Sequence, residues 1–373
     1  MSRSSAPVHI RAIAPYQAGK PIEELAREYG LDPAIIIKLA SNENPLGCSG
    51  RVREALAEAA ASLHGRYPDA NGFDLKADIA AFQKVPMDWI TLGNGSNDLL
   101  ELASLAFLDA ASSAVYAEHA FVVYRLATQA RGARHLMVPA RNYGHDLPAM
   151  LDAVTDDTRL VFIANPNNPT GTHLPPADVH AFLGQVQARH GDSVTVLLDV
   201  AYDEYLDPEE RADYAAWVRE FPNLIVTRTF SKAYGLAGLR VGYALAQPAI
   251  TDLLNRVRQP FNVGVLAQLA ARVALKDTDF LAQTHALNRQ GRELLQTGFA
   301  RLGLDYVPSH TNFVLVRVGD APRVNEELLR RGIIVRPVSG DGLPHHLRVT
   351  IGLPAENDRL LQALADILVA PGR

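Results

Sequence analysis

Lys232 is the residue of this 373-residue chain whose surroundings most strongly suggest chemistry. It follows the apolar, β-branched run 224–227, which is typical of a buried strand, so its ammonium group needs a partner, a lost proton or a reaction. A lysine whose pKa shifts readily can form an imine with a carbonyl compound. Ser231 and Arg240 of the same segment, 229–240, offer a hydroxyl and a permanent cation, which suit a phosphate. Taken alone, the segment is equally compatible with a solvated loop lysine.

Polar side chains also follow two other apolar runs directly. Asn168 lies in the segment Asn-Pro-Asn-Asn-Pro-Thr-Gly after the run 160–164, and Asp199 and Tyr202 follow the run 194–198. Because ligands gather at the carboxyl ends of the strands of a parallel sheet, we expect these groups and Lys232 to meet at one edge. Loops that only connect strands would not need an amide, a carboxylic acid, a phenol and an amine at these positions, so a functional site is favoured.

A glycine-rich turn, Gly-Asn-Gly-Ser-Asn at 93–97, separates a short strand at 90–92 from a helix at 98–107. Such a turn presents backbone N–H groups and the positive end of the helix dipole, so Ser96 and Asn97 are candidates for binding a phosphate. The turn is neither a complete G-x-G-x-x-G nor a Walker lysine loop, which argues against dinucleotides and nucleoside triphosphates.

The pattern of strands and helices along the chain predicts an α/β fold that would position these groups. Continuous apolar runs alternate with helical patterns, which indicates a large domain with a mostly parallel sheet flanked by helices. After residue 260, a helical stretch at 265–302 and strands at 311–316, 333–335 and 347–351 indicate a smaller α+β domain. The predicted division is an N-terminal segment 1–40 that packs with the small domain, a large domain 41–260 and a small domain 261–373. The strand-like runs of the large domain are 90–92, 114–117, 136–138, 160–164, 194–198, 224–227 and 241–246.

Together these groups suit pyridoxal 5'-phosphate, which carries an aldehyde, a ring nitrogen, a phenolic oxygen and a phosphate. We expect Lys232 to attach to the aldehyde and later to move a proton, and Asp199, with a depressed pKa, to keep the ring nitrogen protonated. Asn168 and Tyr202 would donate to the phenolic oxygen. The large domain would bind this cofactor, and its phosphate would be surrounded by Ser96, Asn97, Ser231 and Arg240.

Composition excludes several other classes of protein. A net charge of −5 without a basic block argues against nucleic-acid binding. No segment is apolar for the length of a bilayer and no signal-peptide pattern opens the chain, so we expect a cytoplasmic protein that does not enter a membrane. The single cysteine, Cys48, rules out a disulfide framework and a cysteine-cluster metal site. No metal site is predicted, and the pair His345 and His346 is interpreted as solvated.

Several motifs resemble those of pyridoxal-phosphate aminotransferases of fold type I: the segments 165–171 and 229–240, and Asp-x-x-Tyr at 199–202. More narrowly, Pro-Tyr-Gln-Ala-Gly-Lys-Pro at 15–21, Ser-Asn-Glu-Asn-Pro-Leu-Gly at 41–47, Arg-Tyr-Pro-Asp at 66–69 and Leu-Arg-Val-Thr-Ile-Gly at 347–352 resemble the histidinol-phosphate aminotransferase subfamily. The matches cover nearly the whole chain.

The resemblance implies a homodimer with the active site at the subunit interface. Tyr67 would then reach the phosphate of the neighbouring subunit's cofactor and Phe121 would stack on the ring. The substrate would be bound by Tyr16, Asn44, Arg348 and Arg336, although Arg336 is equally compatible with a surface position. Phe121 stands where the family often has tyrosine, which keeps stacking but loses a hydroxyl. His119 and Cys48 stand where proline is frequent, and we interpret Cys48 as a structural thiol.

The implied activity is a transaminase of histidine biosynthesis that exchanges an amino group between L-histidinol phosphate and 2-oxoglutarate or glutamate. An aromatic amino acid aminotransferase is a close alternative, and a phosphorylated amino acid decarboxylase is a different reaction class on the same fold. A transcription regulator with an aminotransferase-like domain would need a DNA-binding module before residue 41, and that segment is short and not basic.

Overall fold

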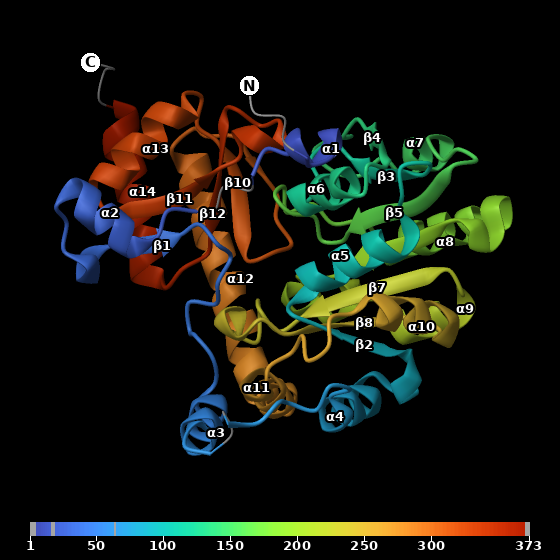
Figure 1. The fold of residues 1–373 in the computed structure, drawn as a ribbon. Helices are drawn as coiled ribbons and strands as arrows, with labels where there is room; N and C mark the ends of the chain where they lie inside the picture. The colour runs from blue at the N-terminus through green and yellow to red at the C-terminus, as the bar shows by residue number, and fades with distance from the viewer. Residues whose placement is uncertain (1–4, 16–18, 63–64, 370–373) are drawn as a thin grey trace.

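The computed structural model describes residues 5–15, 19–62 and 65–369, which form two sheets with helices around them (Figure 1). The larger sheet has seven strands in the order β2-β8-β7-β6-β5-β3-β4. Every neighbouring pair is parallel except the two pairs made by β8, which are antiparallel. Its strands are β2 (Ile90–Gly93), β3 (Ser113–Ala117), β4 (Arg134–Val138), β5 (Thr158–Ala164), β6 (Thr195–Asp199), β7 (Leu224–Thr229) and β8 (Gly242–Leu245). The expected fold class is confirmed.

Helices cover this sheet and explain its unbroken apolar runs. Leu160, Val161, Phe162 and Ile163 of β5 are all fully buried, because parallel strands packed between helix layers have no solvent face. In one layer α5 contacts both α6 and α10, and elsewhere α7 contacts α8 and α9 contacts β7. These helices are α5 (Ser96–Phe107), α6 (Val122–Ala130), α7 (Leu147–Asp152), α8 (Pro176–His190), α9 (Tyr214–Glu220) and α10 (Pro248–Val257).

The smaller sheet has five strands in the order β1-β11-β12-β10-β9. Its first strand comes from the N-terminal part of the chain and pairs in parallel with β11, Ile37 lying opposite Ile333. The other pairs are antiparallel. The elements are β1 (Ile37–Leu39), β9 (Tyr306–Val307), β10 (Phe313–Arg317), β11 (Ile333–Pro337) and β12 (His346–Thr350), with the helices α13 (Ala321–Arg330) and α14 (Pro354–Val369).

The N-terminal segment touches both parts of the molecule. Leu25 and Ala26 of α2 (Ile22–Tyr29) share a buried cluster with Leu329 and Ile334 of the smaller-sheet region. The short helix α1 (Val8–Arg11) contacts α6 instead, and the backbone oxygen of His9 accepts a hydrogen bond from Gln129. The first part of the segment therefore packs on the large sheet, and the second part on the small one.

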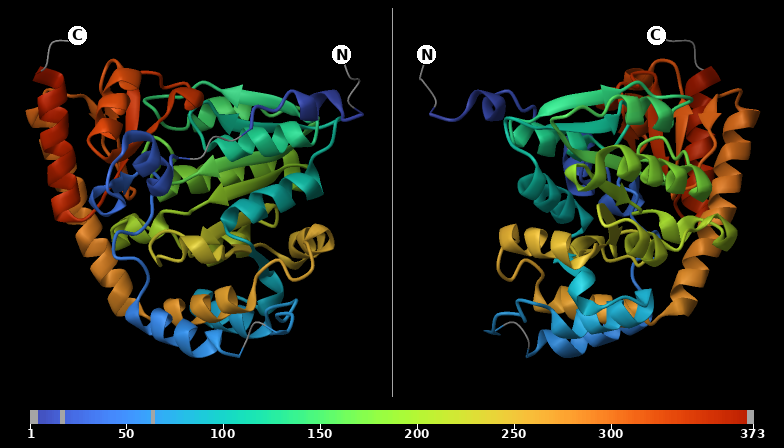
Figure 2. Two further views of the ribbon diagram at one scale, coloured as in Figure 1. Left: turned by 60° about the vertical axis from the view of Figure 1, so that its left-hand side comes forward. Right: turned by 90° about the vertical axis from the view of Figure 1, so that its right-hand side faces the viewer.

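The helical stretch expected at 265–302 is two helices, α11 (Val265–Leu275) and α12 (Thr278–Arg301). Asp277 separates them, because its carboxylate accepts a hydrogen bond from the backbone N–H of Phe280 and caps the second helix. Helix α11 packs on α3 (Gly50–Ala60) and α4 (Phe73–Gln83), and its alanines belong to the large-sheet core. That core thus extends to Leu275, past the expected domain boundary at residue 260. Figure 2 shows α12 continuing from there along the side of the molecule to the small sheet.

Within the described ranges, no helix combines the length and the apolar character that crossing a membrane requires.

Candidate active site

A cavity of about 820 Å³ opens at the carboxyl ends of the large sheet's parallel strands, between that sheet and the smaller one. Its volume is in the range of small-molecule sites. Eleven of the residues singled out from the sequence line it: Ser96, Asn97, Phe121, Asn168, Asp199, Tyr202, Ser231, Lys232, Arg240, Arg336 and Arg348.

Lys232 stands at the centre of this cavity's polar groups, directly after β7. Its Nζ donates to the backbone oxygen of Ser41 at 3.2 Å and lies 5.9 Å from the centre of the Tyr202 ring. Burial lowers the pKa of Lys232 to about 8, and the positive charge of Arg348 contributes to the same shift. At pH 7 roughly a tenth of this amine is then unprotonated, far more than for a lysine with the ordinary pKa of 10.5, and this free amine can act as a nucleophile or a base.

Asp199 is the last residue of β6 and is buried at the floor of the cavity. Tyr124 donates to its Oδ2 at 2.9 Å and Thr227 to its Oδ1 at 3.2 Å. Burial raises the pKa of Asp199 and outweighs these two hydrogen bonds, which is opposite to the depressed pKa expected beside a pyridinium. The lowered pKa expected for Asp199 would require the positive charge of the protonated ring nitrogen. The protein's own hydrogen bonds and the charge of Lys232 lower this pKa by less than burial raises it.

A second group of polar residues surrounds the beginning of α5. Arg240 donates to the hydroxyl of Ser231 and to the backbone oxygen of Ala237, both at 3.1 Å, within the Lys232 loop. It also donates to the backbone oxygen of Asn94 at 3.4 Å, so it joins this loop to the turn before α5. Gly95 precedes the helix with a φ of 78°, and a Cβ there would lie 2.2 Å from an Arg240 nitrogen. Only glycine fits this close approach. Arg240, Ser231 and the first N–H groups of α5 are thus the groups here that could hold an anion.

Tyr202 is held by the loop that follows β1. Asn42 donates from its side-chain amide to the Tyr202 hydroxyl at 2.9 Å, while its own Oδ1 accepts from Thr350 of β12 at 3.0 Å. Asn42 has a φ of 54°, a left-handed conformation that asparagine tolerates better than most residues. Asn42 thereby links the segment after β6 to β12 through two hydrogen bonds.

The opposite side of the cavity contains two arginines. Arg336 and Arg348 are cross-strand partners on β11 and β12, and both line the cavity. Arg348 donates to the Oδ1 of Asn168 and to the backbone oxygen of Ala40, each at 2.6 Å, and its guanidinium lies 5.2 Å from the centre of the Phe313 ring. Two cations facing one cavity form an anion site suited to a phosphate or a carboxylate.

Three expected site residues are not among those that line the cavity. Tyr16 lies outside the described residues. Asn44 is buried nearby, but its amide donates to the backbone oxygen of Ala233 and to Thr284, so it holds the Lys232 loop from behind. Tyr67 is 83% exposed and stacks on Phe261 at a ring-centre distance of 4.7 Å.

Sequence reasoning missed three residues that support the site. Asn42 stands two positions before the expected Asn44, within the same amide-rich loop, and only the structure distinguishes their roles. Tyr124 lies one turn after Phe121 on α6, a spacing that could have indicated a shared face. Thr227 belongs to an apolar strand and carried no such signal.

The other residues singled out from the sequence, His345, His346, Cys48 and His119, do not line the cavity. His346, interpreted from the sequence as solvated, is buried on β12 and packs edge-on against Tyr143, because its strand is internal to the small sheet. His345 is exposed and its Nδ1 contacts the backbone oxygen of Gly319 at 2.9 Å. Cys48 is a half-buried free thiol in the loop that packs on Gly235. His119 contacts the backbone oxygen of Asp341 at 2.8 Å.

These groups fit the expected cofactor. A half-buried lysine and a buried carboxylate line the same cavity without an ion pair between them, as far as the described residues show. The amine of Lys232 suits the aldehyde of pyridoxal phosphate, and the carboxyl group of Asp199 suits its ring nitrogen. The anion site at α5 suits the phosphate, and the second anion site remains for another ligand.

Comparison with known proteins extends this picture. The family model described as aminotransferase class I and II matches residues 34–364. The chain is 60% identical to histidinol-phosphate aminotransferase 1 of Cupriavidus pinatubonensis over 362 residues, 96% of this chain and 95% of that protein. It is 59% identical to histidinol-phosphate aminotransferase 2 of Ralstonia nicotianae, over 99% and 98% of the two lengths. The crystal structure of histidinol-phosphate aminotransferase from Sinorhizobium meliloti in complex with pyridoxal-5'-phosphate superimposes with a TM-score of 0.88 at 29% identity, covering 98% of each chain.

Proposed function

The chain belongs to the aminotransferase class I and II family, and we propose that it is the transaminase that exchanges an amino group between L-histidinol phosphate and 2-oxoglutarate in histidine biosynthesis. The relatives named above, at about 60% identity over nearly the whole chain, support this substrate. The observation that carries the proposal is the pair Arg336 and Arg348, which presents two cations to the cavity that also contains Lys232. Histidinol phosphate, glutamate and 2-oxoglutarate all bring an anion to such a pair.

Pyridoxal 5'-phosphate, when bound, supplies a carbonyl carbon that accepts the amino group and a ring that withdraws electrons from the substrate carbon. Arg240, Ser231 and the N-terminal turn of α5, with Ser96 and Asn97, would hold its phosphate. Asp199, positioned by Tyr124 and Thr227, would bind the ring nitrogen. Phe121 would cover the ring face, and Tyr202 and Asn168 would donate to the phenolic oxygen.

In the proposed reaction Lys232 would transfer the proton, and Arg348 and Arg336 would bind the substrate. Lys232, with its pKa lowered to about 8, would take a proton from the substrate carbon as a free amine and return it at the other end of the reacting system. Arg348 would bind the substrate anion and, through its hydrogen bond to Asn168, would orient the amide that is proposed to donate to the cofactor's phenolic oxygen. Arg336 would complete the anion site.

Initial rates with several amino donors test the substrate. At the same concentration of 2-oxoglutarate, L-histidinol phosphate should give a kcat/KM at least about 100-fold above those for phenylalanine, tyrosine and leucine, because only it fills a site built for a phosphate. A preference for phenylalanine would instead identify an aromatic amino acid aminotransferase. Carbon dioxide release from a phosphorylated amino acid, without stoichiometric keto product, would identify a decarboxylase.

We propose further that the enzyme is a cytoplasmic homodimer in which Tyr67 reaches the cofactor phosphate of the neighbouring subunit. An aromatic pair on the surface, Tyr67 stacked on Phe261, is the kind of feature that protein interfaces cover. We propose in addition that Tyr16 binds the substrate and that Asn44 supports the loop of Lys232 from behind. The small domain would comprise the five-stranded sheet with its helices, joined by the second part of the N-terminal segment.

A further inference from the structure

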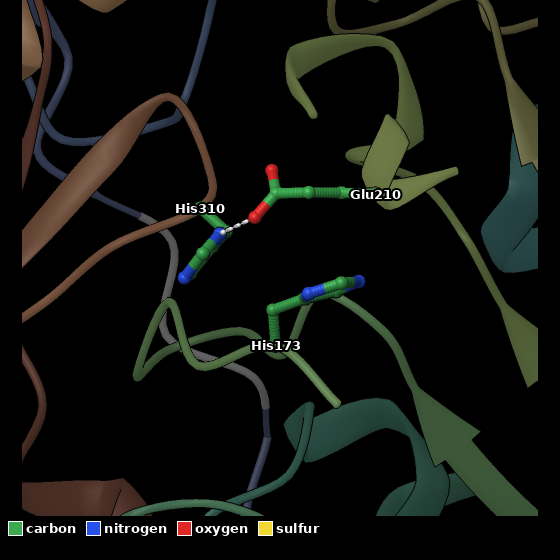
Figure 3. Close-up of side chains that lie close together, drawn as sticks. All are labelled: His173, Glu210 and His310. Atoms are coloured by element: carbon green, nitrogen blue, oxygen red, sulfur yellow. Dashed lines mark ion pairs between the residues drawn. The ribbon is translucent and has the colours of Figure 1, made fainter. Parts of the chain in front are cut away.

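Two histidines and a glutamate converge at the junction of the two sheets, outside the cavity described above (Figure 3). His173 follows the Asn-rich loop after β5, Glu210 ends the short 3-10 helix Pro208–Glu210, and His310 precedes β10. One ligand atom from each lies within 4.8 Å of the other two. The Nδ1 of His310 is 3.1 Å from Oε1 of Glu210, and the two imidazole rings have their centres 5.1 Å apart.

The backbone around each of the three residues is fixed. The N–H of His310 donates to the oxygen of Gly171 at 2.9 Å, and the N–H and oxygen of Leu174, next to His173, both bond to the side chain of Asn165. Gly171 has a φ of 80°, and a Cβ there would lie 2.6 Å from Oγ of Ser309, so the two histidine loops are packed closely. The imidazoles are therefore held near each other by contacts that do not involve the rings.

Glu210 is oriented in the same way. Its Oε2 accepts a hydrogen bond from the backbone N–H of Asp207 at 3.2 Å, while its backbone N–H donates to the oxygen of Asp207. This reciprocal arrangement leaves Oε1 directed at His310. Hydrogen bonds of this kind, made by atoms that do not touch the ion, set the direction of metal ligands.

We propose that His173, Glu210 and His310 form a binding site for one divalent transition-metal ion, with Zn²⁺ as the expected occupant. Two imidazole nitrogens and one carboxylate oxygen are a known zinc ligand set, with a fourth position left for water. Zinc–ligand bonds of about 2.0–2.2 Å require the donor atoms to approach one another more closely than 4.8 Å, which side-chain rotations can provide. Calcium and magnesium prefer oxygen ligands and are not expected here.

The charges around the site favour a cation. The two imidazoles interact with the carboxylates of Asp203, Asp207 and Glu210 and with one guanidinium, that of Arg292 on α12. Asp203 is paired with Arg228, and Asp207 lies near Arg289, so Glu210 is the carboxylate directed at the two imidazoles.

The site lies where a bound ion would link the two sheets. His310 leads into β10 of the small sheet, whereas His173 and Glu210 follow β5 and β6 of the large sheet, so the ion would fasten one sheet to the other. Two residues after His310, Asn312 donates to the backbone oxygen of Asn42, the residue that holds Tyr202. A bound ion would thus restrict the loop of Asn42, which lines the cavity, without taking part in the reaction.

Direct metal titration of the untagged, cofactor-loaded enzyme tests this site. After treatment with a chelator, the enzyme should bind one Zn²⁺ per chain in calorimetry, and Co²⁺ should give the visible absorption of a nitrogen- and oxygen-ligated ion. His173→Ala, His310→Ala and Glu210→Gln should each weaken Zn²⁺ binding by at least about tenfold. At the same concentration, Zn²⁺ should also raise the thermal midpoint of wild type by more than it raises that of any of these variants.

His180→Ala is the matched control. His180 also pairs with a glutamate, Glu220, at 2.8 Å, but this pair is on the surface and has rings of Trp217 and Phe221, not a second imidazole, beside it. This variant should bind Zn²⁺ as wild type does. Circular dichroism spectra establish that each variant is folded. The proposal is overturned if wild type shows no stoichiometric binding, or if His173→Ala/His310→Ala binds Zn²⁺ as tightly as wild type, which would place the ion elsewhere.

Discussion

Arg336 and Arg348 lie directly opposite each other on the antiparallel strands β11 and β12, and both line the cavity that contains Lys232. Like charges in directly opposite positions destabilise a sheet unless something compensates. Arg348 is also largely buried, so its charge is partly removed from water. The carboxylate of Asp341 interacts with both arginines and offsets part of this repulsion, and a bound anionic substrate would offset more of it.

The first prediction concerns these two arginines. Arg348→Gln should lower kcat/KM for L-histidinol phosphate by about 10–100-fold, because one charged hydrogen-bonding partner is worth about 1.5–3 kcal/mol. Arg336→Gln should have a smaller effect on kcat, since Arg348 also orients Asn168. Steady-state kinetics with both cosubstrates measure this. Arg348→Lys, which keeps the charge but cannot bridge Asn168 and Ala40, should recover only part of the loss. Equal kinetics for wild type and Arg348→Gln would remove the arginine from the site.

The second prediction is that Lys232 is the attachment point of the cofactor. After reduction with borohydride and proteolysis, wild type should yield a peptide in which Lys232 carries the cofactor mass. Lys232→Ala should yield none, should lack the visible absorbance of the lysine-attached cofactor, and should lose transaminase activity. Lys20, a partly exposed lysine paired with Glu28, provides the control, since Lys20→Ala should retain attachment. Attachment that persists in Lys232→Ala would contradict the assignment.

The third prediction is a pH dependence. Because the pKa of Lys232 is lowered to about 8, the rate at which added pyridoxal phosphate attaches to cofactor-free enzyme should rise as the pH rises through about 8 and then level off. The folded pKa lies below the ordinary value of 10.5, so between these two values the unfolded chain binds more protons. Stability from this group therefore rises with pH across that window. A midpoint for attachment near pH 10 would show an unperturbed amine.

The fourth prediction separates Asp199 from the tyrosine that holds it. Asp199→Asn should slow single-turnover proton transfer by about 10²–10⁴-fold, because the ring nitrogen loses its acidic partner. Tyr124→Phe removes only one hydrogen bond to Oδ2 and should slow it by about tenfold. Tyr116→Phe is the control, since that buried hydroxyl contacts His135 instead. Rates of Asp199→Asn within tenfold of wild type would assign the role to another group.

The strand ends were the predictable part of this site. Asn168, Asp199 and Lys232 each follow a continuous apolar run, and parallel strands bring their carboxyl ends to one edge, so local patterns sufficed. The pairing of Arg336 with Arg348 depends on the register between two strands of a different sheet, which no local pattern contains. The choice of Asn42 over Asn44 as the partner of Tyr202 depends on backbone conformation within one loop. His173, Glu210 and His310 come from three distant segments and meet only through the packing of the two sheets.

The fifth prediction tests the proposed subunit interface. Sedimentation should show a dimer, and Tyr67→Phe should weaken cofactor binding while leaving the free energy of unfolding of the chain nearly unchanged, because the side chain is exposed. In hybrids of Tyr67→Phe with Lys232→Ala subunits, the lysine-bearing site receives an intact Tyr67 from its neighbour. That site should bind cofactor more tightly than the sites of the Tyr67→Phe homodimer. Equal affinity would place Tyr67 away from the phosphate.

The pairing of β1 with β11 has a consequence for how the protein is made. β1 ends at Leu39, but its partner strand begins at Ile333, so the ribosome must add about 300 residues before the pair can form. At the usual rates of about 5–20 residues per second, this takes roughly 15–60 s. During that time the loop containing Asn42 has neither Thr350 nor Asn312 to bond with, although the large sheet can already be complete. The nascent enzyme therefore acquires its scaffold early and its working active site only at the end of translation.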